Sequence, residues 1–199
     1  MGTLPQPCLA LITNSAQYGE IDLDLIDNAV TGGVDMIQLR EPTFTESKII
    51  KTGNLIKEIT RNRALLIFNG KPKIAIKINA DGVQLSENKM DTIASDIPKG
   101  LLIGRSIHSK IAALQSDRAG ADFFIAGTVF RTDSHPGIEP AGLGLIGIIS
   151  EVLRAPILGI GGITENNAES VIKAGAHGIA VISSIWQSSD SKAAAETLK

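Results

Sequence analysis

Residues 157–185 read ILGIGGITENNAESVIKAGAHGIAVISSI, and this stretch indicates how the rest of the chain is organised. The apolar runs Ile157–Ile160 and Gly178–Ile182 each have the length and composition of a buried strand. Between them, Glu165–Ala174 predicts a helix with Thr164 as its N-cap. The stretch therefore predicts a strand, helix, strand unit near the C-terminus.

Small residues follow both strands of this unit. Gly161 and Gly162 come after the first strand, and Ser183 and Ser184 come after the second. Backbone N–H groups in such turns can point outward and bind a phosphate. In a (β/α)₈ barrel the usual phosphate site lies in the loops after the seventh and eighth strands. We therefore expect these four residues to bind phosphate, although a glycine pair can also serve only a tight turn.

The rest of the chain continues the alternation of strands and helices. Further strands are expected at Cys8–Thr13, Met36–Arg40, Ala64–Phe68, Gly82–Leu85, Leu101–Ser106 and Phe123–Gly127. Helices are expected at Asp22–Val30, from Thr43 or Thr45 to Thr60, and at Ile74–Asn79, Met90–Ser95, Ser109–Arg118 and Leu143–Leu153. This pattern is typical of an α/β protein with a parallel sheet.

An internal repeat distinguishes between a closed and an open sheet. A small-residue helix end, an acid or histidine, and an apolar strand recur in GGVDMIQL (32–39), NADGVQL (79–85), AGADFFIAG (119–127) and AGAHGIAV (174–181). Four copies over eight strands favour a single (β/α)₈ TIM barrel forming one domain over residues 1–199. An open α/β sheet with chance similarity among its helix ends is the alternative.

Composition limits the function classes. The chain has 199 residues, a net charge of −2 and no Lys/Arg cluster, so we expect neither nucleic acid nor membrane as a partner. Cys8 is the single cysteine, which excludes an internal disulfide, and MGTLPQPC has no signal-peptide pattern. We therefore expect a cytoplasmic protein with a small-molecule partner and no cofactor or metal.

Polar residues at the ends of the predicted strands are the candidates for ligand binding, because a barrel places its active site there. Gln38 and Arg40 are two residues apart on one strand, so both side chains point into the barrel mouth, where arginine can bind an anion. Asn69 and Ser106 end two other strands. An Arg40–Glu41 surface pair is the alternative for the arginine.

Motifs spread over nearly the whole chain carry a family resemblance. They are IQLRE, IFNG, ADGVQLSE, IGRSIHS, ADFFIAGTVFRTDSHPG, ILGIGGI and AGAHGIAVISSI. Together and in order, they resemble the superfamily of thiamin phosphate synthase and its TenI relatives. The resemblance implies a barrel enzyme, often a homodimer, that handles a phosphorylated thiazole. The synthase alkylates thiazole phosphate with a hydroxymethylpyrimidine diphosphate and uses Mg²⁺, whereas TenI-type tautomerases isomerise a thiazole carboxylate phosphate to its aromatic form.

Four positions depart from the synthase pattern. Pro42 stands where a diphosphate-binding lysine is expected, and Gly70 and Lys89 replace two magnesium carboxylates. His135 replaces the lysine of the T-x-T-K loop. FNG and GRSIHS are closer to TenI-type sequences. We therefore expect a TenI-like thiazole tautomerase, with thiamin phosphate synthase as one alternative and a non-catalytic phosphate-ligand-binding or regulatory relative as another.

The proton carrier of such a tautomerase needs a separate candidate, because Thr128 stands where the TenI pattern has a catalytic histidine. A threonine hydroxyl is a poor base at neutral pH. His135 is the candidate, since it lies in the loop whose T-x-T-K pattern also suggests Thr132 and Ser134 as substrate-binding residues. His135 can equally be a solvated loop residue, in which case the chemistry falls elsewhere, for example to Glu41 or Glu87. His108 can begin a helix, and His177 is expected on the opposite, stability face.

Overall fold

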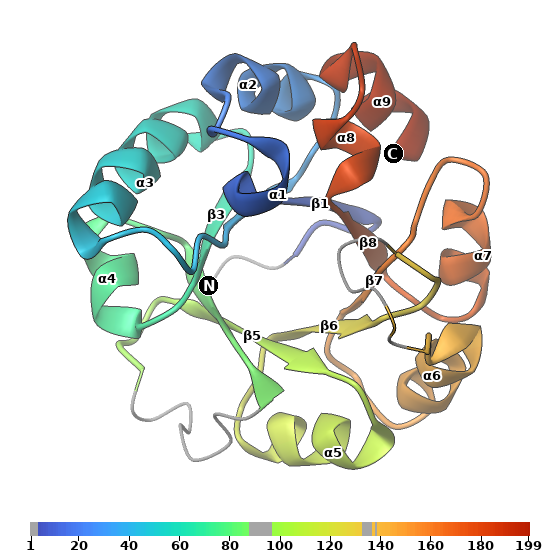
Figure 1. Ribbon diagram of the computed structural model, residues 1–199. Coiled ribbons are helices and arrows are strands. Elements are labelled where there is room, and N and C mark those ends of the chain that lie inside the picture. Colours follow the sequence, from blue (N-terminus) through green and yellow to red (C-terminus); the bar gives the residue numbers. More distant parts are fainter. Residues whose placement is uncertain (1–3, 88–96, 133–136, 138) are drawn as a thin grey trace.

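The structure, a computed structural model, describes residues 4–87, 97–132, 137 and 139–199. In this part of the chain, parallel strands close into a barrel in which each strand pairs with its neighbours in sequence and β1 pairs with β8 (Figure 1). The strands are β1 (Cys8–Ile12), β2 (Met36–Leu39), β3 (Leu65–Asn69), β4 (Gly82–Leu85), β5 (Leu102–Ile107), β6 (Phe123–Gly127), β7 (Ile157–Ile160) and β8 (Gly178–Val181). The predicted (β/α)₈ barrel is confirmed.

Helices surround the barrel as an outer ring (Figure 1). They are α1 (Ser15–Tyr18), α2 (Leu23–Thr31), α3 (Glu46–Thr60), α4 (Pro72–Lys77), α5 (Lys110–Arg118), α6 (Gly142–Ser150), α7 (Ala168–Lys173), α8 (Ser183–Trp186) and α9 (Ser191–Leu198). The sequence reasoning missed α1 and α9, and the helix expected at Met90–Ser95 falls outside the described residues. No helix within the described ranges is long and apolar enough to cross a bilayer.

Two apolar layers hold the barrel together. Strand residues that point inward form the inner layer, which includes Met36, Ile67, Phe123 and Leu158, all fully buried. Residues that point outward pack against the helices and form the larger core. Because the bulky inner residues fill the barrel below its upper end, the interior is a packed core and leaves room for a ligand only at the mouth.

The internal repeat has a structural basis at the N-terminal ends of the strands. In each copy, an aspartate or histidine stands directly before an even-numbered strand. Its side chain accepts a hydrogen bond from a backbone N–H at the start of the preceding odd-numbered strand. The donor is the second residue of β1, β3 and β5 and the first residue of β7. The four contacts are Leu9 to Asp35 Oδ2 (2.8 Å), Leu66 to Asp81 Oδ2 (2.7 Å), Ile103 to Asp122 Oδ2 (2.8 Å) and Ile157 to His177 Nδ1 (3.3 Å). We call these pairs the base clamps. They explain why an acid or acceptor recurs there, and they confirm His177 on the face opposite the mouth.

Candidate functional site

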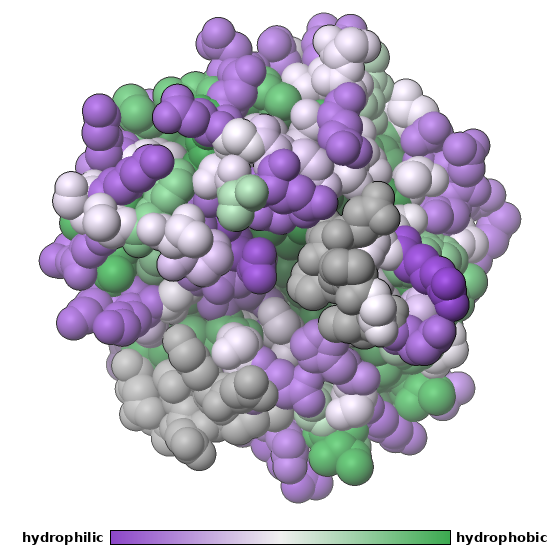
Figure 2. All heavy atoms as spheres, viewed as in Figure 1, coloured by the Kyte–Doolittle hydropathy of each residue, from purple (hydrophilic) through white to green (hydrophobic). Residues whose placement is uncertain are grey.

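A cavity of about 480 Å³ opens at the C-terminal end of the barrel. Figure 2 shows it as a hollow near the centre of the face, with hydrophilic side chains around it. Of the residues proposed from sequence, the cavity wall includes Gln38, Arg40, Asn69, Ser106, Thr132, Gly161, Gly162 and Ser183. Candidates from β2, β3, β5, β7 and β8 are thus brought together. Ser134 and His135 lie outside the described residues, so their proposed roles stay predictions.

The turn after β7 is shaped for close approach of a ligand to the backbone. Gly161 and Gly162 have φ angles of +105° and +61°, which glycine adopts without strain. A Cβ on Gly161 would lie 2.4 Å from Thr128 Cγ2. Within the described chain, no hydrogen bond uses the backbone N–H of Gly161, Gly162, Ile163 or Ser183. These free donors beside the cavity are what an anion requires.

Two side chains stabilise this turn through hydrogen bonds to its backbone. Asn167 Nδ2 donates to Gly162 O and its Oδ1 accepts from Thr164 N, both at 2.9 Å. α7 begins only at Ala168, after a turn in which Thr164 O accepts from Ala168 N at 2.9 Å, so the predicted helix start at Glu165 with a Thr164 cap is wrong. Ser184 Oγ donates to Ile163 O. The Ser184 hydroxyl thus supports the turn, and Ser184 is not part of the cavity wall as described.

The floor of the cavity is a polar layer inside the barrel. Asn69 Nδ2 donates to Gln38 Oε1 at 3.1 Å, and Gln84 Nε2 donates to Ser106 Oγ at 3.0 Å. Gln38 and Gln84 are almost completely buried, yet Gln38 Nε2 and Gln84 Oε1 have no partner among the described atoms. Buried polar atoms normally find partners, so this layer has free hydrogen-bonding capacity for a ligand. From sequence, Gln84 stands among the polar residues at the predicted strand ends but received no binding role, although VQL in the second repeat copy matches IQL around Gln38.

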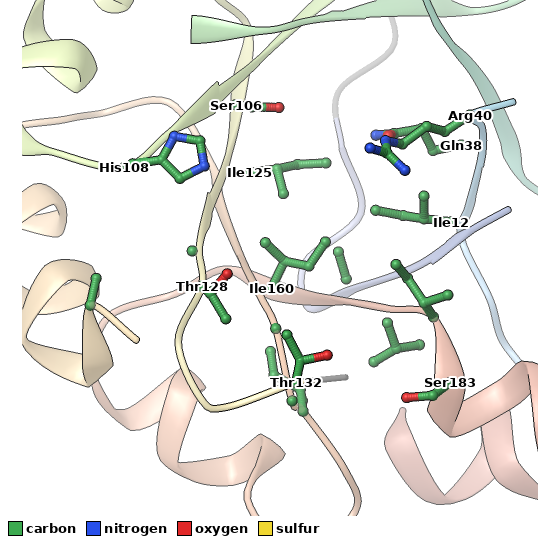
Figure 3. A pocket seen from close by; sticks show the side chains of 18 of the residues that line it. Ile12, Gln38, Arg40, Ser106, His108, Ile125, Thr128, Thr132, Ile160 and Ser183 are labelled. Carbon is green, nitrogen blue, oxygen red and sulfur yellow. The ribbon is translucent and has the colours of Figure 1, made fainter. Parts of the chain in front are cut away.

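Arg40 reaches the cavity beside Gln38, as Figure 3 shows. Its backbone N–H donates to Thr13 Oγ1 at 3.0 Å, which fixes the chain at the end of β2. Glu41 does not pair with it, because the buried Glu41 carboxylate accepts the backbone N–H of Ser15 at 3.1 Å. The alternative of an Arg40–Glu41 surface pair is therefore wrong. Arg40 makes no ion pair within the described part of the chain, and its guanidinium is available to an anion.

His108, which the sequence places just past a strand end and to which we assigned no role, also lines the cavity. His108 follows β5, and its Nδ1 lies 2.6 Å from Oε2 of Glu87. Thr128 lies nearby on the wall, at the end of β6 (Figure 3). Arg105, by contrast, is fully buried and is absent from this wall, and burial lowers the pKa of its guanidinium. The motif GRSIHS contained the signal for His108, since it places a histidine two residues after inward-facing Ser106.

The described side chains do not fit the magnesium site that the synthase resemblance implies. A Cβ on Gly70 would lie 2.5 Å from the ring of Phe68, which is itself buried, so a carboxylate cannot simply be added there. Glu87 is occupied by His108, and Glu139 pairs with Arg131. No group of three or more His, Cys, Asp or Glu suited to a metal occurs among the residues described, which do not include Lys89.

Comparison with known proteins identifies the family. The family model described as thiamine monophosphate synthase matches residues 9–185. The chain is 35% identical over 202 residues to the thiamine-phosphate synthase of Chlorobium luteolum, covering 100% of this chain and 94% of the relative. It is 37% identical over 185 residues to that of Methanoculleus marisnigri, covering 91% and 88%. The thiamine phosphate pyrophosphorylase structure from Pyrococcus furiosus superimposes with a TM-score of 0.82 at 32% identity, covering 96% and 93%.

These relatives correct the functional expectation from sequence. Proteins similar over nearly the whole chain are named thiamine-phosphate synthase, so the TenI-like tautomerase assignment is wrong and the synthase alternative is favoured. The error came from giving more weight to a few substituted positions and two short motifs than to similarity along the whole chain. A structure of 3-hexulose-6-phosphate synthase is also similar, with a TM-score of 0.70, but at 20% identity it supports the fold alone. The chain belongs to the thiamine monophosphate synthase family.

Proposed function

We propose that this protein is a thiamin phosphate synthase, which joins hydroxymethylpyrimidine diphosphate to thiazole phosphate and releases diphosphate. The observation that carries the proposal is the similarity to synthases over nearly the whole chain, combined with a cavity that has separate groups for two anions. One anion would bind at the turn after β7 and the other near Arg40.

The turn after β7 is proposed to bind the phosphate of the thiazole. The N–H groups of Gly161, Gly162 and Ile163 and that of Ser183 at the end of β8 supply donors without a positive side chain. Backbone donors at fixed positions lose little conformational entropy on binding, which suits recognition of a small phosphate ester. The thiazole ring would then lie over the apolar part of the wall, which includes Ile125 and Ile160.

The polar floor is proposed to bind the aminopyrimidine ring. This ring offers acceptors at its ring nitrogens and a donor at its exocyclic amine. Gln38 Nε2 is a buried donor without a partner, and the Ser106 hydroxyl can still donate because it accepts from Gln84. A ligand that satisfies Gln38 removes the cost of an unmade buried hydrogen bond, about 1–3 kcal/mol. Arg40, beside Gln38, would then contact the diphosphate.

The reaction needs positioning and charge neutralisation more than proton transfer. The lone pair of the thiazole nitrogen forms a bond to the pyrimidine methylene carbon, and the electron pair of the breaking C–O bond goes to the diphosphate oxygen. The two ends of the cavity hold the reacting atoms together, which converts a bimolecular step into a local one. Donors aimed at the leaving diphosphate stabilise the charge that develops on it.

A coupling assay tests the proposal. The full chain is incubated with both substrates, in parallel with Mg²⁺ and with a chelator, and thiamin phosphate and diphosphate are quantified. We expect both products in equal amounts, and the Pyrococcus furiosus homologue serves as the positive control. Arg40→Gln should reduce the rate at least tenfold, because it removes a charged contact to the leaving group. Absence of both products, while the control protein is active under the same conditions, would reject the synthase function.

A further inference from the structure

His108 and Glu87 form a pair at the edge of the cavity that none of the roles above uses. His108 follows β5 and lines the cavity, while Glu87 follows β4. The 2.6 Å contact joins His108 Nδ1 to Glu87 Oε2, with the His108 side chain 64% exposed and the Glu87 side chain 31% exposed. Figure 3 shows the imidazole ring directed into the cavity beside Ser106 and Thr128.

This contact determines which nitrogen of the His108 ring is available to a ligand. Glu87 occupies the Nδ1 side, so the nitrogen left for a ligand is Nε2. A carboxylate behind a histidine fixes both the orientation of the ring and the position of its hydrogens. With a carboxylate oxygen on one side and a phosphate oxygen on the other, both nitrogens act as donors and the ring binds as an imidazolium.

A diphosphate carries several negative charges, so the charged side chains of the cavity wall matter for its binding. Apart from His108, the charged side chains in the described cavity wall are Arg40 and Glu139, and Glu139 is paired with Arg131. The described side chains also lack a fitting set of carboxylates for a divalent cation. Among the described side chains of the wall, Arg40 and His108 are therefore the groups that can offer positive charge to a diphosphate, and they approach the cavity from different walls (Figure 3).

We propose that His108 binds the diphosphate group of the pyrimidine substrate through Nε2–H, and that Glu87 is the positioning residue that orients the ring. This inference rests on the proposed synthase function. When the C–O bond breaks, its electron pair goes to the diphosphate oxygen, and the hydrogen bond from Nε2 strengthens as charge accumulates on that group. The proton stays on His108, and the new C–N bond takes its electrons from the thiazole nitrogen.

Binding of inorganic diphosphate tests the pair without requiring turnover. Calorimetric titration at pH 6.5 is carried out with the unmodified chain, His108→Gln, Glu87→Gln and the double variant. We expect about tenfold weaker binding for His108→Gln, because a charge-assisted hydrogen bond is lost. Glu87→Gln should weaken binding about threefold, and the double variant should match His108→Gln alone, because Glu87 acts only through the ring. The control Glu58→Gln removes an exposed carboxylate on α3 and should leave the affinity unchanged.

The outcomes separate this inference from the proposed function. Diphosphate affinity that is unchanged in His108→Gln, with a native-like melting curve, overturns the role of His108. Additive losses in the double variant overturn the positioning role of Glu87. If diphosphate binding depends on His108 but the unmodified chain yields no thiamin phosphate, the binding site stands and the synthase function fails.

Discussion

The side-chain amide of Asn167 connects the two ends of the turn after β7, because it donates to Gly162 O and accepts from Thr164 N, each at 2.9 Å. A single side chain thus holds the backbone whose N–H groups face the cavity. Its contacts are local, so its effect on anion binding should exceed its effect on global stability.

Asn167→Asp tests this relationship. The variant keeps an acceptor for Thr164 N but loses the donor to Gly162 O, and it places a negative charge behind the anion site. We expect about tenfold weaker binding of thiazole phosphate in a calorimetric titration, with about 1 kcal/mol lost from the free energy of unfolding. Asn166→Asp is the matched control, since Asn166 is exposed and its side-chain amide donates to Glu165 and not to the turn. Equal affinities in the two variants would show that the turn keeps its shape without Asn167.

Gly161→Ala should distort the same turn on the side that faces the cavity. Its φ of +105° is unfavourable for alanine, and the added Cβ would lie 2.4 Å from Thr128 Cγ2. We expect phosphate affinity to fall at least tenfold and the melting temperature to decrease. Gly144→Ala in α6 is the control, because no atom lies within 4 Å of the added Cβ and alanine favours a helix, so stability should rise slightly. Undiminished phosphate affinity in Gly161→Ala would place the anion elsewhere.

The base clamps predict which residues are interchangeable at position 177. Three of the four clamps use aspartate, and His177 supplies the same acceptor to Ile157 N through Nδ1. His177→Ala should lose about 1–2 kcal/mol in urea unfolding, because the buried N–H loses its partner. His177→Asp should recover most of that loss. A variant with aspartate that is no more stable than the alanine variant would mean that the clamp contributes little at β7.

The buried thiol of Cys8 predicts a difference in stability at alkaline pH. Burial, with a smaller effect of Asp35, raises the pKa of Cys8 to about 12 from 9.0. The unfolded chain therefore releases this proton first, so stability is fully present below about pH 9 and is lost as the pH rises toward 12. Relative to Cys8→Ala, the unmodified chain should lose up to about 1.4 kcal/mol per pH unit in that window. Parallel curves for the two proteins in unfolding titrations from pH 8 to 10.5 would contradict the raised pKa.

The sequence predicted the barrel because strand periodicity and the fourfold repeat are both local signals. It also placed Gln38, Arg40, Asn69 and Gly161 at one mouth, since strand ends in a parallel barrel must meet there. It could not predict that α7 would begin only at Ala168, because the hydrogen bonds of Asn167 to Gly162 O and Thr164 N, which shape the preceding turn, depend on the fold. The Glu87–His108 contact joins residues 21 positions apart, and no local pattern pairs them.

The base clamps divide the barrel into four two-stranded modules, each closed by its own contact between an odd strand and the following even strand. Among the described residues, no contact of this kind joins one module to the next, and the turn at Asn62, between α3 and β3, is exposed. Lys199 also lies beside the segment that precedes β1, since Lys199 Nζ donates to Pro7 O at 2.9 Å. A circular permutant opened at Asn62, with Lys199 joined by a short linker to the segment before β1, is therefore expected to retain all four clamps, whereas one opened inside a module separates the halves of a clamp along the chain.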